Sequence, residues 1–192
     1  APVFEESFET GLGPEWEIRL TNHPGASLTM EDGAVRIHSQ GNRCAFLERA
    51  LPPDVGMVVA RLNPGDDSGQ TWGSGLGVGS GESFLRVNLR SVEGCAGVDR
   101  GLMQMLDPAP VAPGQETWLR IRLTEDSVFF EASSDGVVWV RVRTMQRHWL
   151  KGRRDRLAVG KMSPTGTVMD VKTDSPMGSS QILEVRAYRA TP

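Results

Sequence analysis

Residues 116–143 constrain the fold more than any other stretch, because apolar side chains recur there at every second position. In residues 119–123 leucine and isoleucine alternate with arginine, and the alternation resumes in residues 128–132 and 138–142. A period of two is that of a β-strand with one buried face. Glu125-Asp126 and Ser134-Asp135-Gly136 separate these runs and are turn signals. The stretch therefore predicts an antiparallel meander of three strands.

Within this meander the alternation also assigns faces. Val138, Val140 and Val142 are expected to point to the core, and Trp139 is expected to point the other way. Trp118 and Trp139 are predicted to be packing anchors. An exposed Trp139 would instead be a candidate platform for a sugar ring.

Strand-like segments continue along the whole chain, about thirteen in all, and none has helical spacing. The 22 glycines and 12 prolines supply the turns between them. Asp32-Gly33, for example, predicts a hairpin between residues 26–30 and 34–38. Such a pattern favours two packed antiparallel sheets. We expect one all-β domain over residues 1–192, with its first and last strands paired.

Bulk properties exclude several classes of protein. The net charge of −3 disfavours a nucleic-acid binder, and no apolar run is long enough to span a membrane. Two cysteines make no disulfide scaffold, and two buried thiols are favoured over one bridge between Cys44 and Cys95. The start at Ala1 fits a mature secreted form or an excised domain, and a secreted or cell-surface location is slightly favoured over the cytoplasm.

Several motifs together resemble a known family. They are Phe4, Phe8 and Trp16; Asp32, Gly33 and Ile37; Trp118 to Ile121; Ser133 to Gly136 with Trp139 and Arg143; and Val159 to Pro164. In this order the motifs resemble the concanavalin A-like jelly rolls, particularly the bacterial group of uncharacterised function akin to "regulation of enolase" domains. The resemblance implies a two-sheet antiparallel β-sandwich. It implies little about activity, because this fold hosts lectins, glycan-binding modules, glycosidases and lyases.

Catalytic motifs of such enzymes are missing. Retaining glycosidases of this fold resemble one another in an E-x-D-x-E strand that supplies nucleophile and acid, whereas Glu131 stands alone on its strand. The Q-I-H strand of the lyases is approached by Gln181-Ile182, but Leu183 follows. His23, His38 and His148 lie in no nucleophile motif. The sequence favours a protein that is not an enzyme.

No cofactor is predicted, and zinc spacing is absent. A structural calcium ion is the alternative, because Asp66-Asp67-Ser68 and Asp170 with Asp174 offer oxygen ligands. Solvated acidic loops are favoured. In the final strand the resembling group has an aromatic-acidic-acidic-aromatic motif, whereas this chain has Ile182-Leu183-Glu184-Val185.

Two regions carry the candidate ligand-binding residues. One is a strand face with Arg86, Asn88 and Arg90, flanked by Trp72 and by Asp99-Arg100, where an aromatic plate and planar polar groups suit a sugar. The glycine-rich residues 72–79 indicate a strand that another backbone or a ligand approaches closely. A plain solvated face is the alternative.

The other region is residues 141–156, with seven basic residues against Asp155 alone. Such a segment could dock an acidic polysaccharide or an acidic partner. The alternative is a solvated loop with Trp149 tucked under it.

The leading hypothesis is a non-catalytic carbohydrate-binding or recognition module. An acidic polysaccharide is one candidate ligand. The predicted ligand-binding residues are Trp72, Arg86, Asn88, Arg90, Asp99, Arg100, His148 and Trp149. A glycan-active hydrolase or lyase with an unfamiliar active site comes second. A protein-interaction domain that uses the basic segment comes third.

Overall fold

The structure is a computed structural model that describes residues 1–21, 25–67, 72–80, 83–150, 154–169, 171 and 175–190. These residues form fifteen β-strands and two single 3-10 turns, and they contain no α-helix. The strands of the first sheet are β1 (Phe4–Glu6), β3 (Ala26–Glu31), β4 (Ala34–Ser39), β6 (Val55–Asn63), β11 (Thr117–Leu123), β12 (Ser127–Ser133), β13 (Val140–Gln146) and β15 (Gly178–Arg189). Those of the second sheet are β2 (Glu17–Leu20), β5 (Ala45–Ala50), β7 (Ser74–Ser80), β8 (Ser83–Arg90), β9 (Cys95–Arg100), β10 (Met103–Pro108) and β14 (Arg156–Lys161).

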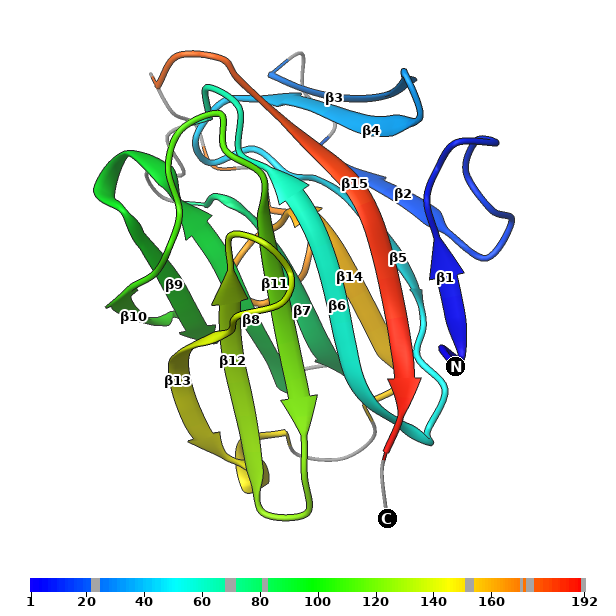
Figure 1. Ribbon diagram of the computed structural model, residues 1–192. Coiled ribbons are helices and arrows are strands. Elements are labelled where there is room, and N and C mark those ends of the chain that lie inside the picture. The colour runs from blue at the N-terminus through cyan, green and yellow to red at the C-terminus, as the bar shows by residue number, and fades with distance from the viewer. Residues whose placement is uncertain are drawn as a thin grey trace.

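Two antiparallel sheets pack face to face (Figure 1). The first sheet runs in the order β13-β12-β11-β6-β15-β4-β3, with β1 also paired to β15. The second runs β10-β9-β8-β7-β14-β5-β2. This architecture confirms the all-β sandwich of the jelly-roll type. The pairing of β1 with β15 confirms that the first and last strands join.

Alternation along the strands builds the core between the sheets. Leu119 and Ile121 of β11 and Leu85 and Val87 of β8 have no exposed surface. The residues between them in sequence therefore lie on the outer faces of the two sheets. Both candidate surfaces described below lie on these outer faces.

The central meander forms as predicted, but its third strand differs. Phe130 pairs with Arg143, whereas the next residue, Glu131, pairs with Arg141, so a bulge interrupts the alternation. Val142 is buried, while Val138 and Val140 are 68% and 44% exposed. The expectation that all three valines face the core is wrong, because β13 begins only at Val140 and the bulge resets its faces.

The Ser133 to Gly136 turn is held by its own side chains. Asp135 accepts hydrogen bonds from the main-chain N–H groups of Val137 and Val138, each at 2.8 Å. These bonds, with that from Ser133, lower the pKa of Asp135. Gly136 has a φ of 73°, and a Cβ there would lie 2.9 Å from the Trp118 ring. The positive φ and the close approach of the Trp118 ring therefore both require glycine at position 136.

The Asp32-Gly33 hairpin is also confirmed, with φ values of 52° and 72° that suit a two-residue turn. Cys44 and Cys95 are both free thiols, and Cys44 is buried. The interpretation of the cysteines as unbridged is therefore confirmed, whereas the expected burial holds for Cys44 and is wrong for the half-buried Cys95.

Candidate functional site

The outer face of the second sheet brings together the polar residues that the sequence assigns to one side. Arg86 and Asn88 alternate with core residues along β8, and Asp99 of β9 lies directly opposite Arg86. On the other side of β8, Gly77 of β7 is the partner of Arg86. Directly opposed residues point to the same face of a sheet, so the predicted common face is confirmed for Arg86, Asn88 and Asp99. Arg100 lies opposite the core residue Leu85, so its placement on this face is wrong.

This face is nevertheless closed, since Arg86, Asn88 and Asp99 have no exposed surface. Arg86 Nε donates to Asp99 Oδ2 at 2.6 Å, and Arg86 also donates to the carbonyl of Met162. Asn88 Nδ2 donates to Asp99 Oδ2 and to Gly97 O, both at 3.0 Å. Burial lowers the pKa of Arg86, and the charge of Asp99 only partly offsets the shift. The expectation of an open ligand face at these three residues is wrong, because they bind one another.

A second apolar cluster covers the face from outside. It comprises Cys44, Phe46, Trp72, Phe84, Ala158 and Met162, and Val168, Met169 and Val171 pack against it. Trp72 is 6% exposed, so it is a packing residue here and no open aromatic plate. A Cβ at Gly77 would lie 2.3 Å from the Phe84 ring. The glycine-rich strand thus makes room for a ring of the chain itself.

Arg90 lies at the end of β8 and is 8% exposed. Its guanidinium donates to Gln104 Oε1 and to Glu93 Oε1, each at 3.1 Å. Arg90 is therefore held at the rim of the second sheet by neighbouring side chains, and the predicted outward projection into a ligand site is wrong for it too.

Arg100, His148 and Trp149 do come together. The Arg100 guanidinium lies 3.4 Å from the centre of the Trp149 ring, and the His148 and Trp149 rings are 4.5 Å apart. His148 is exposed and Trp149 half-buried, packed against the main core. Ser83 fixes the main chain through a hydrogen bond to Trp149 O at 2.7 Å. These three predicted residues form a partly exposed cluster, although Trp149 is tucked in as the alternative interpretation expected.

The basic segment 141–156 does not form one loop. Its side chains spread over both sheets: Arg141 bonds Glu131, Arg143 bonds Asp107, Arg147 bonds Thr124 O, Arg154 bonds Val55 O and Arg156 bonds Glu48. Lys151 and Arg153 lie outside the described residues. The prediction of a single continuous basic docking loop is therefore wrong for the described part of the segment.

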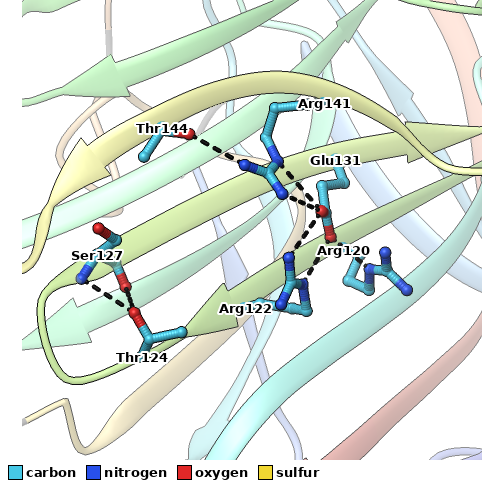
Figure 2. Close-up of polar contacts among 7 residues, drawn as sticks. All are labelled: Arg120, Arg122, Thr124, Ser127, Glu131, Arg141 and Thr144. Carbon is cyan, nitrogen blue, oxygen red and sulfur yellow. Dashed lines mark hydrogen bonds and ion pairs between the residues drawn. The ribbon is translucent and has the colours of Figure 1, made fainter.

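A different basic surface lies on the outer face of the first sheet, where Arg120 and Arg122 of β11 and Arg141 of β13 surround Glu131 of β12 (Figure 2). Arg120 Nε donates to Glu131 Oε2 at 2.6 Å. Arg122 makes a two-pronged contact, Nε to Oε2 at 3.0 Å and Nη2 to Oε1 at 3.1 Å. Arg141 Nη2 and Nε reach Oε1 at 3.1 and 3.2 Å. We name these four residues the arginine–glutamate cluster.

Aromatic rings are stacked into this cluster. The Arg120 guanidinium lies 3.9 Å from the centre of the Trp139 ring, and those of Arg141 and Arg122 lie 4.1 and 4.8 Å from that of Phe129. Both rings are half-buried. The cluster with Phe129 and Trp139 is the arginine–aromatic face. The sequence already contained its signal, since arginines alternate with core residues in 119–123 and the predicted meander lies beside them. The register and the bulge that bring all three arginines to Glu131 were not predicted.

The electrostatics of the cluster fix its charge states. Burial acts to raise the pKa of Glu131, but hydrogen bonds from Arg122 and Arg120 outweigh it, so the pKa is lowered. The hydrogen bond to Glu131 raises the pKa of Arg122. Glu131 is ionised at neutral pH, and it cannot serve there as a proton donor.

One pocket on the outer face of the second sheet stays open. It measures about 380 Å³ and is lined by Glu15, Glu17, Glu48, Arg49, Ala50, Asp155 and Arg156. Glu17 of β2 and Glu48 of β5 are directly opposed, and Arg156 Nε lies 2.7 Å from Glu48 Oε2. The sequence did not predict that Glu17, Glu48 and Arg156 meet, because β2, β5 and β14 are separate in the chain.

Two of the acidic residues predicted as calcium ligands, Asp66 and Asp67, bind other groups of the chain. Asp66 Oδ1 accepts the N–H of Ser179 at 2.6 Å, and Asp67 Oδ2 accepts Lys161 Nζ at 2.6 Å. Ser68, Asp170 and Asp174 lie outside the described residues. No group of three or more potential metal ligands occurs among the residues that the structure describes. A calcium role stays a prediction.

Comparison with known proteins shows the fold. No protein-family model matches the chain, and no curated protein sequence matches it. The solved structure "Bacteroides ovatus Xyloglucan PUL GH43B" is 16% identical with a TM-score of 0.66, and the match covers 99% of this chain and 40% of that one. The "Apo Crh5 transglycosylase" is 13% identical with a TM-score of 0.68, covering 100% and 86%. The laminarinase from Flavobacterium sp. UMI-01 is 12% identical with a TM-score of 0.65, covering 98% and 100%.

The chain therefore spans less than half of the Bacteroides protein but all of the laminarinase. These likenesses establish a β-sandwich shared with glycan-active proteins. The narrower resemblance to the "regulation of enolase" group stays a prediction. No helix among the described residues is long and apolar enough to cross a membrane.

Proposed function

We propose that the protein is a non-catalytic carbohydrate-binding module, and that the arginine–aromatic face on the first sheet is its binding surface. The observation that carries the proposal is the fixed array of guanidinium groups beside the half-buried rings of Phe129 and Trp139. Sugar recognition uses this combination, because a ring packs against C–H groups while planar donors pair with oxygens. The shared fold with glycan-active proteins supports it. A location outside the cell accords with this function.

The same face argues against chemistry there. Hydrolysis of a glycosidic bond needs two carboxyl groups, one of which must carry a proton. Within the arginine–glutamate cluster Glu131 is the one carboxylate, and it is held ionised by its arginines. Binding without turnover is the function that this arrangement supports.

Calorimetry against a panel of neutral and anionic polysaccharides tests the proposal. Trp139→Ala should weaken binding about tenfold, since it removes a stacking ring and frees Arg120. Trp149→Ala, at the separate rim cluster, is the matched control and should leave binding unchanged. No binding at millimolar glycan, or loss only with Trp149→Ala, would contradict the proposal.

A second candidate function is glycan hydrolysis in the pocket of Glu17 and Glu48. Directly opposed residues of an antiparallel pair have Cβ atoms about 5 Å apart, which suits the spacing of a retaining carboxylate pair. Arg156 Nε, 2.7 Å from Glu48 Oε2, would orient Glu48 as the nucleophile. Release of reducing ends from the same panel, lost on Glu48→Gln, would establish this activity. Turnover that survives Glu48→Gln would exclude this pocket as its source.

A further inference from the structure

We propose that the arginine–aromatic face recognises an anionic group, a carboxylate or sulfate carried by an acidic polysaccharide. This inference rests on the proposed function and names the ligand class of the same surface. It follows from the hydrogen-bond donors that the cluster leaves unused, from its charge and from its pre-organisation.

The donors are unevenly used. Glu131 occupies Nε of Arg120, Nε and Nη2 of Arg122, and Nε and Nη2 of Arg141, while Arg141 Nη1 donates to Thr144 Oγ1 at 3.3 Å. Within the described residues no partner accepts from the Nη atoms of Arg120 or from Nη1 of Arg122. Both residues lie on the partly exposed outer face, with side chains 19% and 34% exposed. Two neighbouring guanidinium groups therefore keep charged N–H donors for a ligand.

The charge is not balanced. Three guanidinium groups share one carboxylate, which leaves a net charge of +2 in the cluster. Several other arginines of the described chain have a carboxylate of their own, as in Arg36 with Glu31, Arg143 with Asp107 and Arg189 with Asp54. A further anion at the arginine–glutamate cluster would complete the neutralisation that those pairs already have.

The groups are also held in place before a ligand arrives. Glu131 is 4% exposed and anchors one side of each guanidinium, and Phe129 lies against those of Arg122 and Arg141. Ordering free arginine side chains would cost affinity, so anchoring them favours binding. The planar fork of arginine matches carboxylate and sulfate groups in geometry.

The half-buried rings of this face suit a polysaccharide better than other polyanions. The chain as a whole carries a net charge of −3, which opposes long-range attraction to any polyanion, so contacts at the face itself must select the ligand. The local excess of charge in the cluster is confined to three adjacent strands. A ligand that adds sugar–ring contacts to a few anionic contacts fits this surface.

The experiment compares polymers that differ only in charge. Binding of polygalacturonate and of its carboxyl-reduced form, and of dextran sulfate and dextran, is measured by calorimetry at two salt concentrations. The wild type should bind an anionic polymer at least about tenfold more tightly than its neutral counterpart. Added salt should weaken that preference. Equal affinity for charged and neutral forms would overturn the inference and leave the proposed function standing, whereas no binding to any polymer would overturn both.

Variants locate the anion. Arg120→Gln with Arg122→Gln should reduce anionic binding about tenfold or more and should bring the ratio of anionic to neutral affinity close to one. Arg36→Gln is the matched control, because it removes one arginine paired to one glutamate on the same sheet. Arg122→Lys keeps the charge and the fold but loses the two-pronged geometry, and it should also weaken binding. Full affinity in the double variant, or equal binding of double-stranded DNA, would overturn the assignment.

Discussion

Glu131 shows how one residue can hold a surface in a defined electrostatic state. It lies on β12 between β11 and β13, so strands on both sides present arginines to its two oxygens. Its carboxylate is an internal counter-ion and an anchor. Removing its charge should therefore affect stability and the ordering of all three arginines.

The pH dependence of Glu131 gives a signed prediction. Its pKa in the folded protein lies below its ordinary value of 4.5, so it stabilises the fold fully above about pH 4.5 and loses this contribution as pH falls through the folded pKa. Glu131→Gln should thus destabilise the protein at pH 7 and progressively less below pH 4.5. Urea unfolding between pH 3 and pH 7 measures the difference in free energy of unfolding between the wild type and this variant. Glu125→Gln, in the exposed turn before β12, is the control, and a constant difference at all pH values would contradict the prediction.

Asp99 gives a second prediction at this scale. Asp99→Ala leaves Arg86 charged, fully buried and without its carboxylate, which should lower the free energy of unfolding by about 3–5 kcal/mol. Asp54→Ala breaks the exposed pair with Arg189 and should cost less than about 1 kcal/mol. Chemical denaturation compares the two. A small loss at Asp99 would mean that the face is more open to water than the structure shows.

At the scale of elements, the packing of a β8 side chain over β7 explains why β7 is rich in glycine. The ring of Phe84 on β8 lies over Gly77 on β7, and segment 162–169 packs on top of it through Met162 and Val168. The outer face of this sheet is thereby turned into a second, smaller core. The strand pair and the covering segment should behave as one packing unit.

A compensating pair of substitutions tests that unit. Gly77→Ala places a methyl group against the Phe84 ring and should cost about 1–3 kcal/mol through overpacking. Phe84→Leu removes the atoms that clash, so the double variant should be more stable than the sum of the single effects implies. Thermal and urea unfolding give the coupling energy. If the destabilisations of the two single variants simply add in the double variant, the Phe84 ring is not the reason for glycine at position 77.

For the whole molecule, stability comes from packing and polar contacts without a covalent cross-link. Cys44, directly before β5, and Cys95, the first residue of β9, are free thiols. A reducing agent should therefore leave the melting temperature unchanged, and thiol titration of the unfolded protein should count two thiols. A fall in melting temperature with reductant would indicate a bridge and contradict this. Ser replacement of the half-buried Cys95 should likewise be tolerated.

The sequence alone determined the local features of this protein. Alternation, turn residues and the lack of helical spacing are properties of neighbouring residues, so they predicted the sandwich, the Asp32-Gly33 hairpin and the common face of Arg86 and Asn88. The pairing of the first and last strands was also predicted, from the general form of such sandwiches.

Tertiary structure alone decided which faces are open and which charges meet. Whether Arg86 faces water depends on segment 162–169, more than 70 residues later. Whether Glu131 is isolated depends on the strand register and the bulge within the meander. Burial is set by residues distant in sequence and ion pairing by the exact strand register, so a one-dimensional pattern cannot fix either of them. The predicted ligand face is closed and the arginine–aromatic face is partly open for that reason.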